Sequence, residues 1–155
     1  MSVPNLTLAL CAMTCLAAGI ARAGEPVTWQ FKADTGNGQV LKVELTAQCE
    51  EGWHIYALAP TGDEGPLPTV IDLAENAAYQ RVGGPQEPEP ALAMDPNFGM
   101  KLSFHGGTVA FWQLIERVSP RAFTVSGSVE YMACNDKTCL PPHTVPFVLE
   151  IPASY

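Results

Sequence analysis

The chain has 155 residues, of which 8 are basic and 16 acidic, so its formal net charge at pH 7 is −8. This charge excludes nucleic acid as a partner, because binding to phosphate groups requires a basic surface. Gly and Pro number 13 and 14, about 17 % of the chain against a usual ~12 %. This composition favours strands and turns over helices.

The N-terminal segment predicts export from the cytoplasm. It is apolar and ends in Ala21-Arg22-Ala23, which fits the small-x-small cleavage pattern of a secretory signal peptide. The apolar run is shorter than the ~20 residues that a stable membrane-spanning helix needs, and no second such run follows. We therefore expect a signal peptide at 1–23 and a single domain at 24–155 that is periplasmic and has no membrane span after cleavage.

Alternation of apolar and polar residues predicts short strands along most of the remaining chain. A period of two turns one face of each strand inward. Two segments interrupt the pattern: 83–90, rich in Gly, Pro and Glu, is expected to be an irregular surface loop, and 91–98 is expected to be a helical turn or a loop. The expected strands are 27–33, 41–48, 53–58, 68–73, 79–82, 100–105, 109–115, 122–132 and 144–152.

The spacing of these strands is typical of an all-β protein. Short strands that recur roughly every 8–12 residues are the signature of a β-sandwich. Segment 109–115 is apolar on both faces, as a central strand would be. Pro146 falls within the last run and predicts an edge strand or a bulge, because proline cannot donate a ladder hydrogen bond. We expect a β-sandwich of about eight or nine strands.

Two cysteines, Cys134 and Cys139, bracket the loop between the last two predicted strands. Asn135 and Asp136 follow the first of them, and both are turn formers. Residues that face each other across paired strands have Cα atoms about 4.5–5.5 Å apart, within the range that a disulfide needs. Exported proteins keep such bonds, so we expect this pair to close and Cys49 to be the odd cysteine left over.

Three segments carry a family resemblance, namely VEYMACNDKTCLPP at 129–142, GWHIY at 52–56 and DPNFG at 95–99. The first is similar to the active-site hairpin of the N-terminal domain of DsbD, a bacterial thiol:disulfide interchange protein. The second resembles an early strand of that family, and the third resembles the segment that leads into its later strands. The resemblance implies an immunoglobulin-like β-sandwich.

The resemblance also implies roles for individual residues. Cys134 and Cys139 would cycle between dithiol and disulfide, with Cys139 forming the mixed disulfide with a partner protein and Cys134 resolving it. A cap loop would fold over the pair and shield it with an aromatic residue. Asp95 and Phe98 are the cap-loop residues that match best. No cofactor and no metal are expected.

The function implied is that of an exported protein-disulfide reductase component. It would pass reducing equivalents through its Cys-x4-Cys pair to other periplasmic thiol proteins. By resemblance, the acceptors are disulfide isomerases and the thioredoxin-like proteins of cytochrome c maturation. The sequence stops at Tyr155, without the membrane domain and the thioredoxin-like domain of DsbD, so a separate membrane reductant is expected to supply the electrons.

Two other functions remain open from the residues alone. The disulfide could be a structural staple in a non-enzymatic sandwich that binds other proteins, and closing so short a loop would stabilise the fold by roughly 2 kcal/mol. Alternatively, Cys134, Cys139 and His143 form a Cys-x4-Cys-x3-His set whose thiolate and imidazole groups suit zinc or Cu(I), with Cys49 or Met132 as a further ligand.

Other candidate residues carry less chemistry. Cys49 ends a predicted strand beside two glutamates, which disfavour a thiolate, so we expect an inert buried residue rather than a redox partner. His54 and Tyr56 share one strand face, and His105 precedes a turn. No serine or acid stands at a recognisable triad spacing from them, so hydrolase chemistry has no support.

Overall fold

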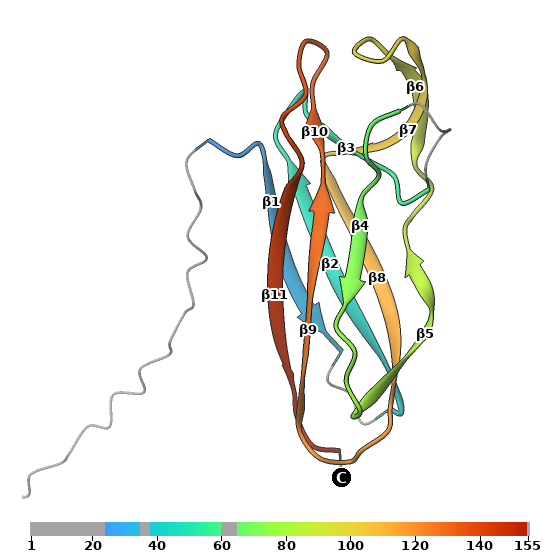
Figure 1. Cartoon of the computed structure of the whole chain (residues 1–155), viewed down its shortest axis with the longest axis vertical. Coiled ribbons are helices and arrows are strands. Elements are labelled where there is room, and N and C mark those ends of the chain that lie inside the picture. Colours follow the sequence, from blue (N-terminus) through green and yellow to red (C-terminus); the bar gives the residue numbers. More distant parts are fainter. Residues whose placement is uncertain (1–23, 35–37, 60–64, 155) are drawn as a thin grey trace, which may run out of the picture.

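Strands supply all the regular structure in the described part of the chain, and no helix occurs there. This computed structural model describes residues 24–34, 38–59 and 65–154, and the predicted signal peptide at 1–23 lies outside them. The all-β prediction is confirmed. No segment within these ranges forms a helix capable of crossing a lipid bilayer. The strands in Figure 1 are β1 (Val27–Ala33), β2 (Val40–Cys49), β3 (His54–Tyr56), β4 (Val70–Leu73), β5 (Tyr79–Gln86), β6 (Ala91–Asp95), β7 (Met100–Gly106), β8 (Thr108–Arg117), β9 (Phe123–Tyr131), β10 (Ala133–Cys134) and β11 (His143–Ile151).

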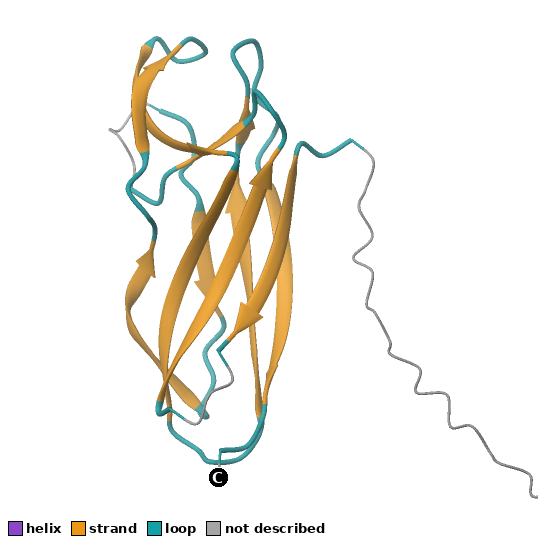
Figure 2. Cartoon of the chain, turned by 180° about the vertical axis from the view of Figure 1, so that it is seen from behind, coloured by secondary structure: helices purple, strands orange, loops and turns teal. Residues whose placement is uncertain are grey.

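The strands form three antiparallel sheets. Two long sheets, in the orders β1-β2-β8-β5 and β11-β9-β4, face each other as the layers of a sandwich (Figure 1). The third sheet, β10-β3-β7-β6, is shorter and lies at one end of the sandwich. The β6–β7 hairpin and the loop after β10 both project from this end, away from the C-terminus (Figure 2). The immunoglobulin-like architecture therefore ends in a small separate sheet.

The core lies between the two long sheets, as the alternation of the sequence predicts. On β2, the inward residues Leu41, Val43 and Leu45 are at most 1 % exposed. They belong to one buried cluster with residues of both sheets, among them Phe111 on β8 and Val129 on β9 of the facing sheet. β8 lies between β2 and β5, which confirms it as a central strand. Burial of this apolar surface is the main stabilising contribution to the fold.

The predicted hairpin around the cysteine loop is confirmed. β9 and β11 pair along their whole length, from Tyr131 opposite His143 to Phe123 opposite Ile151. β11 is the edge strand of its sheet, as Pro146 predicts, because an edge position tolerates the missing ladder hydrogen bond. This long hairpin holds the cysteine loop at the end of the sandwich.

The expected irregular loop at 83–90 is wrong in its first half. β5 continues to Gln86, which pairs with Trp112, and its register on β8 shifts after Val82. Gly83 has a φ of +68° at the shift, a conformation that glycine adopts without steric cost and that suits a β-bulge. Glycine and proline therefore mark an irregular strand here rather than the end of one.

The expected helical turn or loop at 91–98 is also wrong in part, because residues 91–95 form β6 and pair with β7. Four of its five residues are exposed. An edge strand that is open on both faces has no need to alternate apolar and polar residues, so the pattern gives no strand signal. Together with the two-residue β10, this strand raises the number of strands in the described residues to eleven.

Candidate functional site

Cys134 and Cys139 form a disulfide with Cα atoms 4.0 Å apart. The two residues are also an isolated antiparallel bridge across the neck of the loop. Cys134 has no exposed surface, whereas Cys139 is only partly buried. The two sulfur atoms are therefore unequal in their access to a reaction partner.

The side chain of Asn135 shapes the loop between the cysteines. Its Oδ1 accepts hydrogen bonds of 2.9 Å from the backbone N–H groups of both Lys137 and Thr138. The backbone N–H of Asn135 donates a 2.9 Å hydrogen bond to the carbonyl of Thr138, and the backbone N–H of Leu140 donates a 2.8 Å hydrogen bond to the carbonyl of Ala133. An asparagine that bonds the backbone two residues on is a standard turn former. The loop is thus closed by local hydrogen bonds as well as by the disulfide.

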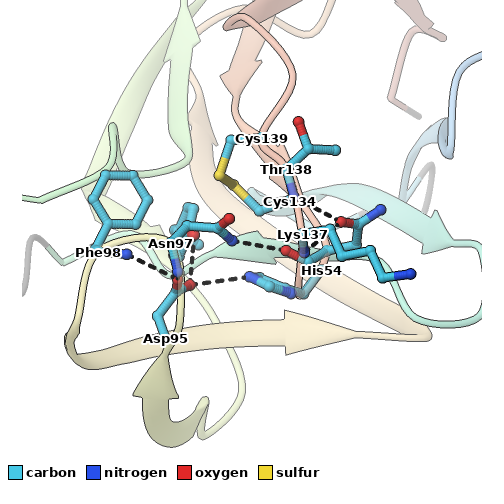
Figure 3. A network of polar contacts seen from close by, with 10 residues as sticks. His54, Asp95, Asn97, Phe98, Cys134, Lys137, Thr138 and Cys139 are labelled. Atoms are coloured by element: carbon cyan, nitrogen blue, oxygen red, sulfur yellow. Dashed lines mark hydrogen bonds and ion pairs between the residues drawn. A yellow bond between two sulfur atoms is a disulfide. The ribbon is translucent and has the colours of Figure 1, made fainter.

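Strand pairing assembles a row of polar groups on one face of the short sheet. Cys134 on β10 pairs with His54 on β3, and Tyr56, two residues along β3, pairs with Phe104 on β7. Directly opposed residues, and residues two apart on one strand, point to the same face. Asp95 at the end of β6 completes the row, and its carboxylate points toward the imidazole of His54 (Figure 3).

Asp95 is the anchor of the loop that connects β6 and β7. It is only 4 % exposed, and its Oδ2 accepts a 2.7 Å hydrogen bond from Tyr56 Oη. Its Oδ1 accepts the backbone N–H of Asn97 at 2.8 Å and that of Phe98 at 3.4 Å. Gly99 N–H donates to Asp95 O at 2.8 Å, which closes the turn. The carboxylate is therefore buried but well satisfied.

These contacts shift the pKa values of the two partners in opposite directions. Burial by itself raises the pKa of Asp95, but the hydrogen bond from Tyr56 and those from the loop backbone outweigh it and hold the pKa below its usual value. The nearby His54 acts in the same direction. Burial, followed by the bond to Asp95, raises the pKa of Tyr56 far above its ordinary value. At neutral pH, Asp95 is therefore charged and Tyr56 is a neutral donor.

The loop of residues 96–99, which we call the cap loop, contacts the cysteine loop through Asn97. Its Nδ2 donates a 2.7 Å hydrogen bond to the carbonyl of Asn135. Phe98 packs edge-on against the ring of Tyr56, with centroids 6.1 Å apart, and is 37 % exposed. Figure 3 shows Asn97 between Phe98 and the cysteine loop. The structure thus brings both predicted cap residues, Asp95 and Phe98, to the same end of the sandwich as the disulfide, and the hydrogen bond to the cysteine loop comes from the amide of Asn97.

The disulfide packs against apolar side chains. Cys134 belongs to a buried cluster with Tyr56 and Leu102. The partly buried side chains packed against this cluster are Met100, Phe104, Met132 and Cys139. Such surroundings exclude water and disfavour ionisation of a thiol. Any thiolate at Cys134 therefore needs a specific stabilising partner.

The metal alternative gains no support from the described residues. Within them, no group of three or more His, Cys, Asp or Glu side chains is placed to hold a metal ion. His143 lies at the start of β11, where its Nδ1 is 3.5 Å from Glu25 Oε1 and its ring packs against Tyr131.

Cys49 lies apart from the disulfide, at the end of β2 in a long sheet. It is a free thiol with 6 % of its surface exposed. Burial raises the pKa of the Cys49 thiol to about 11. At neutral pH this thiol is protonated and shielded, which is the state of an unreactive cysteine.

Sequence reasoning did not identify Asn97, Asn135, His54 or Tyr56 as site residues. The shared face of the two β3 residues was visible in their spacing, but nothing local pointed to their neighbours on β6 and β10. The strand order β10-β3-β7-β6 brings these segments together. That order is a long-range property of the fold.

A family model and several solved structures point to the same protein family. The family model described as "Thiol:disulfide interchange protein DsbD, N-terminal" matches residues 23–150. The reduced N-terminal domain of DsbD from Neisseria meningitidis is similar in structure, with a TM-score of 0.54 and 13 % identity over 82 % of this chain and 88 % of that one. A comparison with curated protein sequences finds no match.

Two further solved structures have the same fold. The N-terminal periplasmic domain of ScsB from Proteus mirabilis gives a TM-score of 0.58 at 18 % identity, over 83 % of this chain and 49 % of that one. A complex between the DsbD and PilB N-terminal domains of Neisseria meningitidis gives a TM-score of 0.51 at 12 % identity, over 77 % of this chain and 80 % of the matched one. The TM-scores, all above 0.5, show a shared fold, and the family model spans most of the sequence. The chain belongs to the family of DsbD N-terminal domains.

Proposed function

We propose that this protein is a periplasmic thiol-disulfide exchange protein that passes reducing equivalents through Cys134 and Cys139. The observation that carries the proposal is the unequal burial of the pair, with Cys139 partly accessible and Cys134 fully buried. An accessible cysteine can meet a partner disulfide, while a buried one beside it can only act on its neighbour. Membership of the DsbD N-terminal family supports the same chemistry.

The exchange runs in two balanced steps from the reduced pair. The Cys139 thiolate attacks one sulfur of the partner disulfide, which forms a mixed disulfide and releases the other partner sulfur as a thiolate. The Cys134 thiolate then attacks Cys139 Sγ, which forms the intramolecular disulfide and releases the second partner sulfur. Two electrons and two protons thus pass to the partner. The observed disulfide is the product state.

The partners follow from the chemistry and from the family. The proposed acceptors are thioredoxin-like or disulfide-isomerase proteins of the periplasm, including those of cytochrome c maturation. A relative from Neisseria meningitidis forms a complex with the N-terminal domain of PilB, which makes a protein domain a reasonable partner here. A separate membrane reductant would return the pair to its dithiol form. The cap loop, with Phe98 and its anchor Asp95, would open to admit either partner.

The reduction potential of the pair tests this proposal. The protein is equilibrated in glutathione or dithiothreitol buffers, the free thiols are alkylated, and the products are counted by mass spectrometry. Exchanging pairs lie above about −300 mV, and structural disulfides lie below it. The Cys134→Ser variant should accumulate a mixed disulfide with an oxidised thioredoxin-like protein, and Cys139→Ser should not. A pair that stays oxidised until the protein unfolds would leave a structural staple in a binding module and overturn the proposal.

A further inference from the structure

His54 has a buried nitrogen without a hydrogen bond. Its side chain is 12 % exposed, and its Nε2 is 3.4 Å from Asp95 Oδ2. The approach lacks hydrogen-bond geometry, so Nε2 has no hydrogen-bond partner among the described residues. Buried polar atoms are normally satisfied, and an exception at a reactive site calls for an explanation.

The ring of His54 is held by its neighbours on both sides. It lies edge-on to Tyr56 with centroids 5.3 Å apart, and it is tilted against Phe104 at 4.9 Å. In the sheet, His54 is directly opposite Cys134. Opposed residues in an antiparallel pair have Cβ atoms about 4.5–5.5 Å apart on the same face. The imidazole is therefore held beside the Asp95 carboxylate, on the same face of the sheet as the buried cysteine.

Cys134 requires a group that can take its proton, and this arrangement supplies one. In the resolving step its thiol must lose a proton, although its position without exposed surface disfavours the thiolate. The neighbouring Lys137 is exposed in the loop, and no helix terminus occurs in the described residues to stabilise the charge. A nucleophile beside a base that a third group orients is the general arrangement for activating a weak nucleophile.

We propose that His54 is the proton acceptor for Cys134 in the resolving step, with Asp95 stabilising the resulting imidazolium. This inference rests on the proposed exchange function. The proton moves from Cys134 Sγ to the imidazole, and the Cys134 thiolate attacks Cys139 Sγ. The partner thiolate that leaves carries the electron pair of the broken bond. His54 later returns its proton to solvent or to that thiolate, so charge and protons balance.

The groups that face His54 leave the imidazole as the one ring positioned to take a proton from the cysteine. Asp95 on β6 is charged and Tyr56 on β3 is neutral, because of the opposite pKa shifts of the pair. β7 contributes the uncharged ring of Phe104, and β10 contributes the cysteine itself. His105 points elsewhere, since its Nε2 is 2.9 Å from Glu87 Oε2. Imidazole is a side chain suited to accepting and returning a proton in catalysis.

A chromogenic aromatic disulfide, 5,5′-dithiobis(2-nitrobenzoate), separates the two steps. Attack by Cys139 on this reagent releases one coloured thiolate, and resolution by Cys134 releases a second, so the reduced full chain should show two phases in stopped flow. For His54→Gln we expect an unchanged first phase and a second phase slowed by at least about tenfold, the low end for loss of a general base. The pH dependence of the second phase should also differ from that of the unmodified protein.

The controls keep the outcome interpretable. His143→Gln removes a histidine at the start of β11 and should leave both phases unchanged. His54→Phe preserves an aromatic ring against Phe104 and should reproduce the slow second phase if His54→Gln folds poorly. Equal slowing of both phases, or an unchanged second phase with the same pH profile, would overturn the role of His54. Failure of the unmodified reduced protein to release either thiolate would instead overturn the exchange function.

Discussion

Asn97 Nδ2 donates a 2.7 Å hydrogen bond to the carbonyl oxygen of Asn135, and this bond connects the cap loop to the cysteine loop. The two residues belong to different hairpins that project from the same end of the sandwich (Figure 2). The acceptor is a backbone carbonyl inside the disulfide-closed loop, so the bond depends directly on the position of that loop. A polar contact of this kind can break and re-form when a partner approaches.

Loss of the Asn97 bond should expose the disulfide. A hydrogen bond contributes about 0.5–1.5 kcal/mol net, so Asn97→Ala should raise the rate of reduction of Cys134–Cys139 by dithiothreitol about two- to tenfold. The rate is measured by alkylation and mass spectrometry at fixed pH. Asn76→Ala is the matched control, since Asn76 Nδ2 donates to Thr124 O, outside the short sheet. An unchanged rate in Asn97→Ala would mean that the amide does not restrain the cap loop.

Removal of the Tyr56 hydroxyl should make the stability of the protein less dependent on pH in the acid range. The pKa of Asp95 is lower in the folded state than its ordinary value of 3.8, so the carboxylate stabilises the fold above about pH 4, and this contribution is lost as the pH falls through the folded pKa. Tyr56→Phe removes the 2.7 Å hydrogen bond and leaves a buried carboxylate less satisfied. We expect a loss of about 1–3 kcal/mol in the free energy of unfolding at pH 7.

Denaturant unfolding between pH 3 and 7 measures this effect. The difference between the unmodified protein and Tyr56→Phe should shrink as the pH falls through the folded pKa of Asp95, because a protonated carboxyl gains less from the hydroxyl. Tyr79→Phe is the control, because Tyr79 Oη donates to the neutral carbonyl of Ala74 and its loss should cost a similar amount at every pH. A pH-independent difference for Tyr56→Phe would contradict the assignment of Tyr56 and Asp95 as a coupled pair.

Local patterns were sufficient to predict the long strands and the cysteine hairpin, because one face of each strand is buried. The alternation on β2 and β9 has a direct counterpart in the buried positions of Leu45 and Val129. β6 was not predicted because four of its five residues are exposed, so apolar and polar residues do not alternate along it. The same limit applies to the site. His54 and Asp95 become neighbours only through the pairing of β3 with β7 and of β7 with β6, and no spacing along the chain encodes that contact.

Addition of a single methyl group at Gly127 on β9 should destabilise the fold. Gly127 is opposite Phe147 on β11 and Leu73 on β4. A Cβ atom added there would collide with the carbonyl oxygen of Asp72 and lie 2.9 Å from Phe147 Cζ. Because the obstacle is backbone, a side-chain rotation cannot relieve it. Overpacking of this kind costs typically 1–3 kcal/mol, and we expect Gly127→Ala to reach the upper part of that range.

Thermal or urea unfolding of Gly127→Ala against Gly84→Ala tests this expectation. A Cβ at Gly84, on β5, would meet no atom within 4 Å, so this control should change the free energy of unfolding by less than about 1 kcal/mol. Gly127 is in the long sheet β11-β9-β4, whereas the disulfide is at the end of the sandwich. The reduction potential of Cys134–Cys139 should therefore stay the same under conditions in which Gly127→Ala remains folded. Equal stability of the two variants would mean that β4 and β9 are less closely paired than the structure describes.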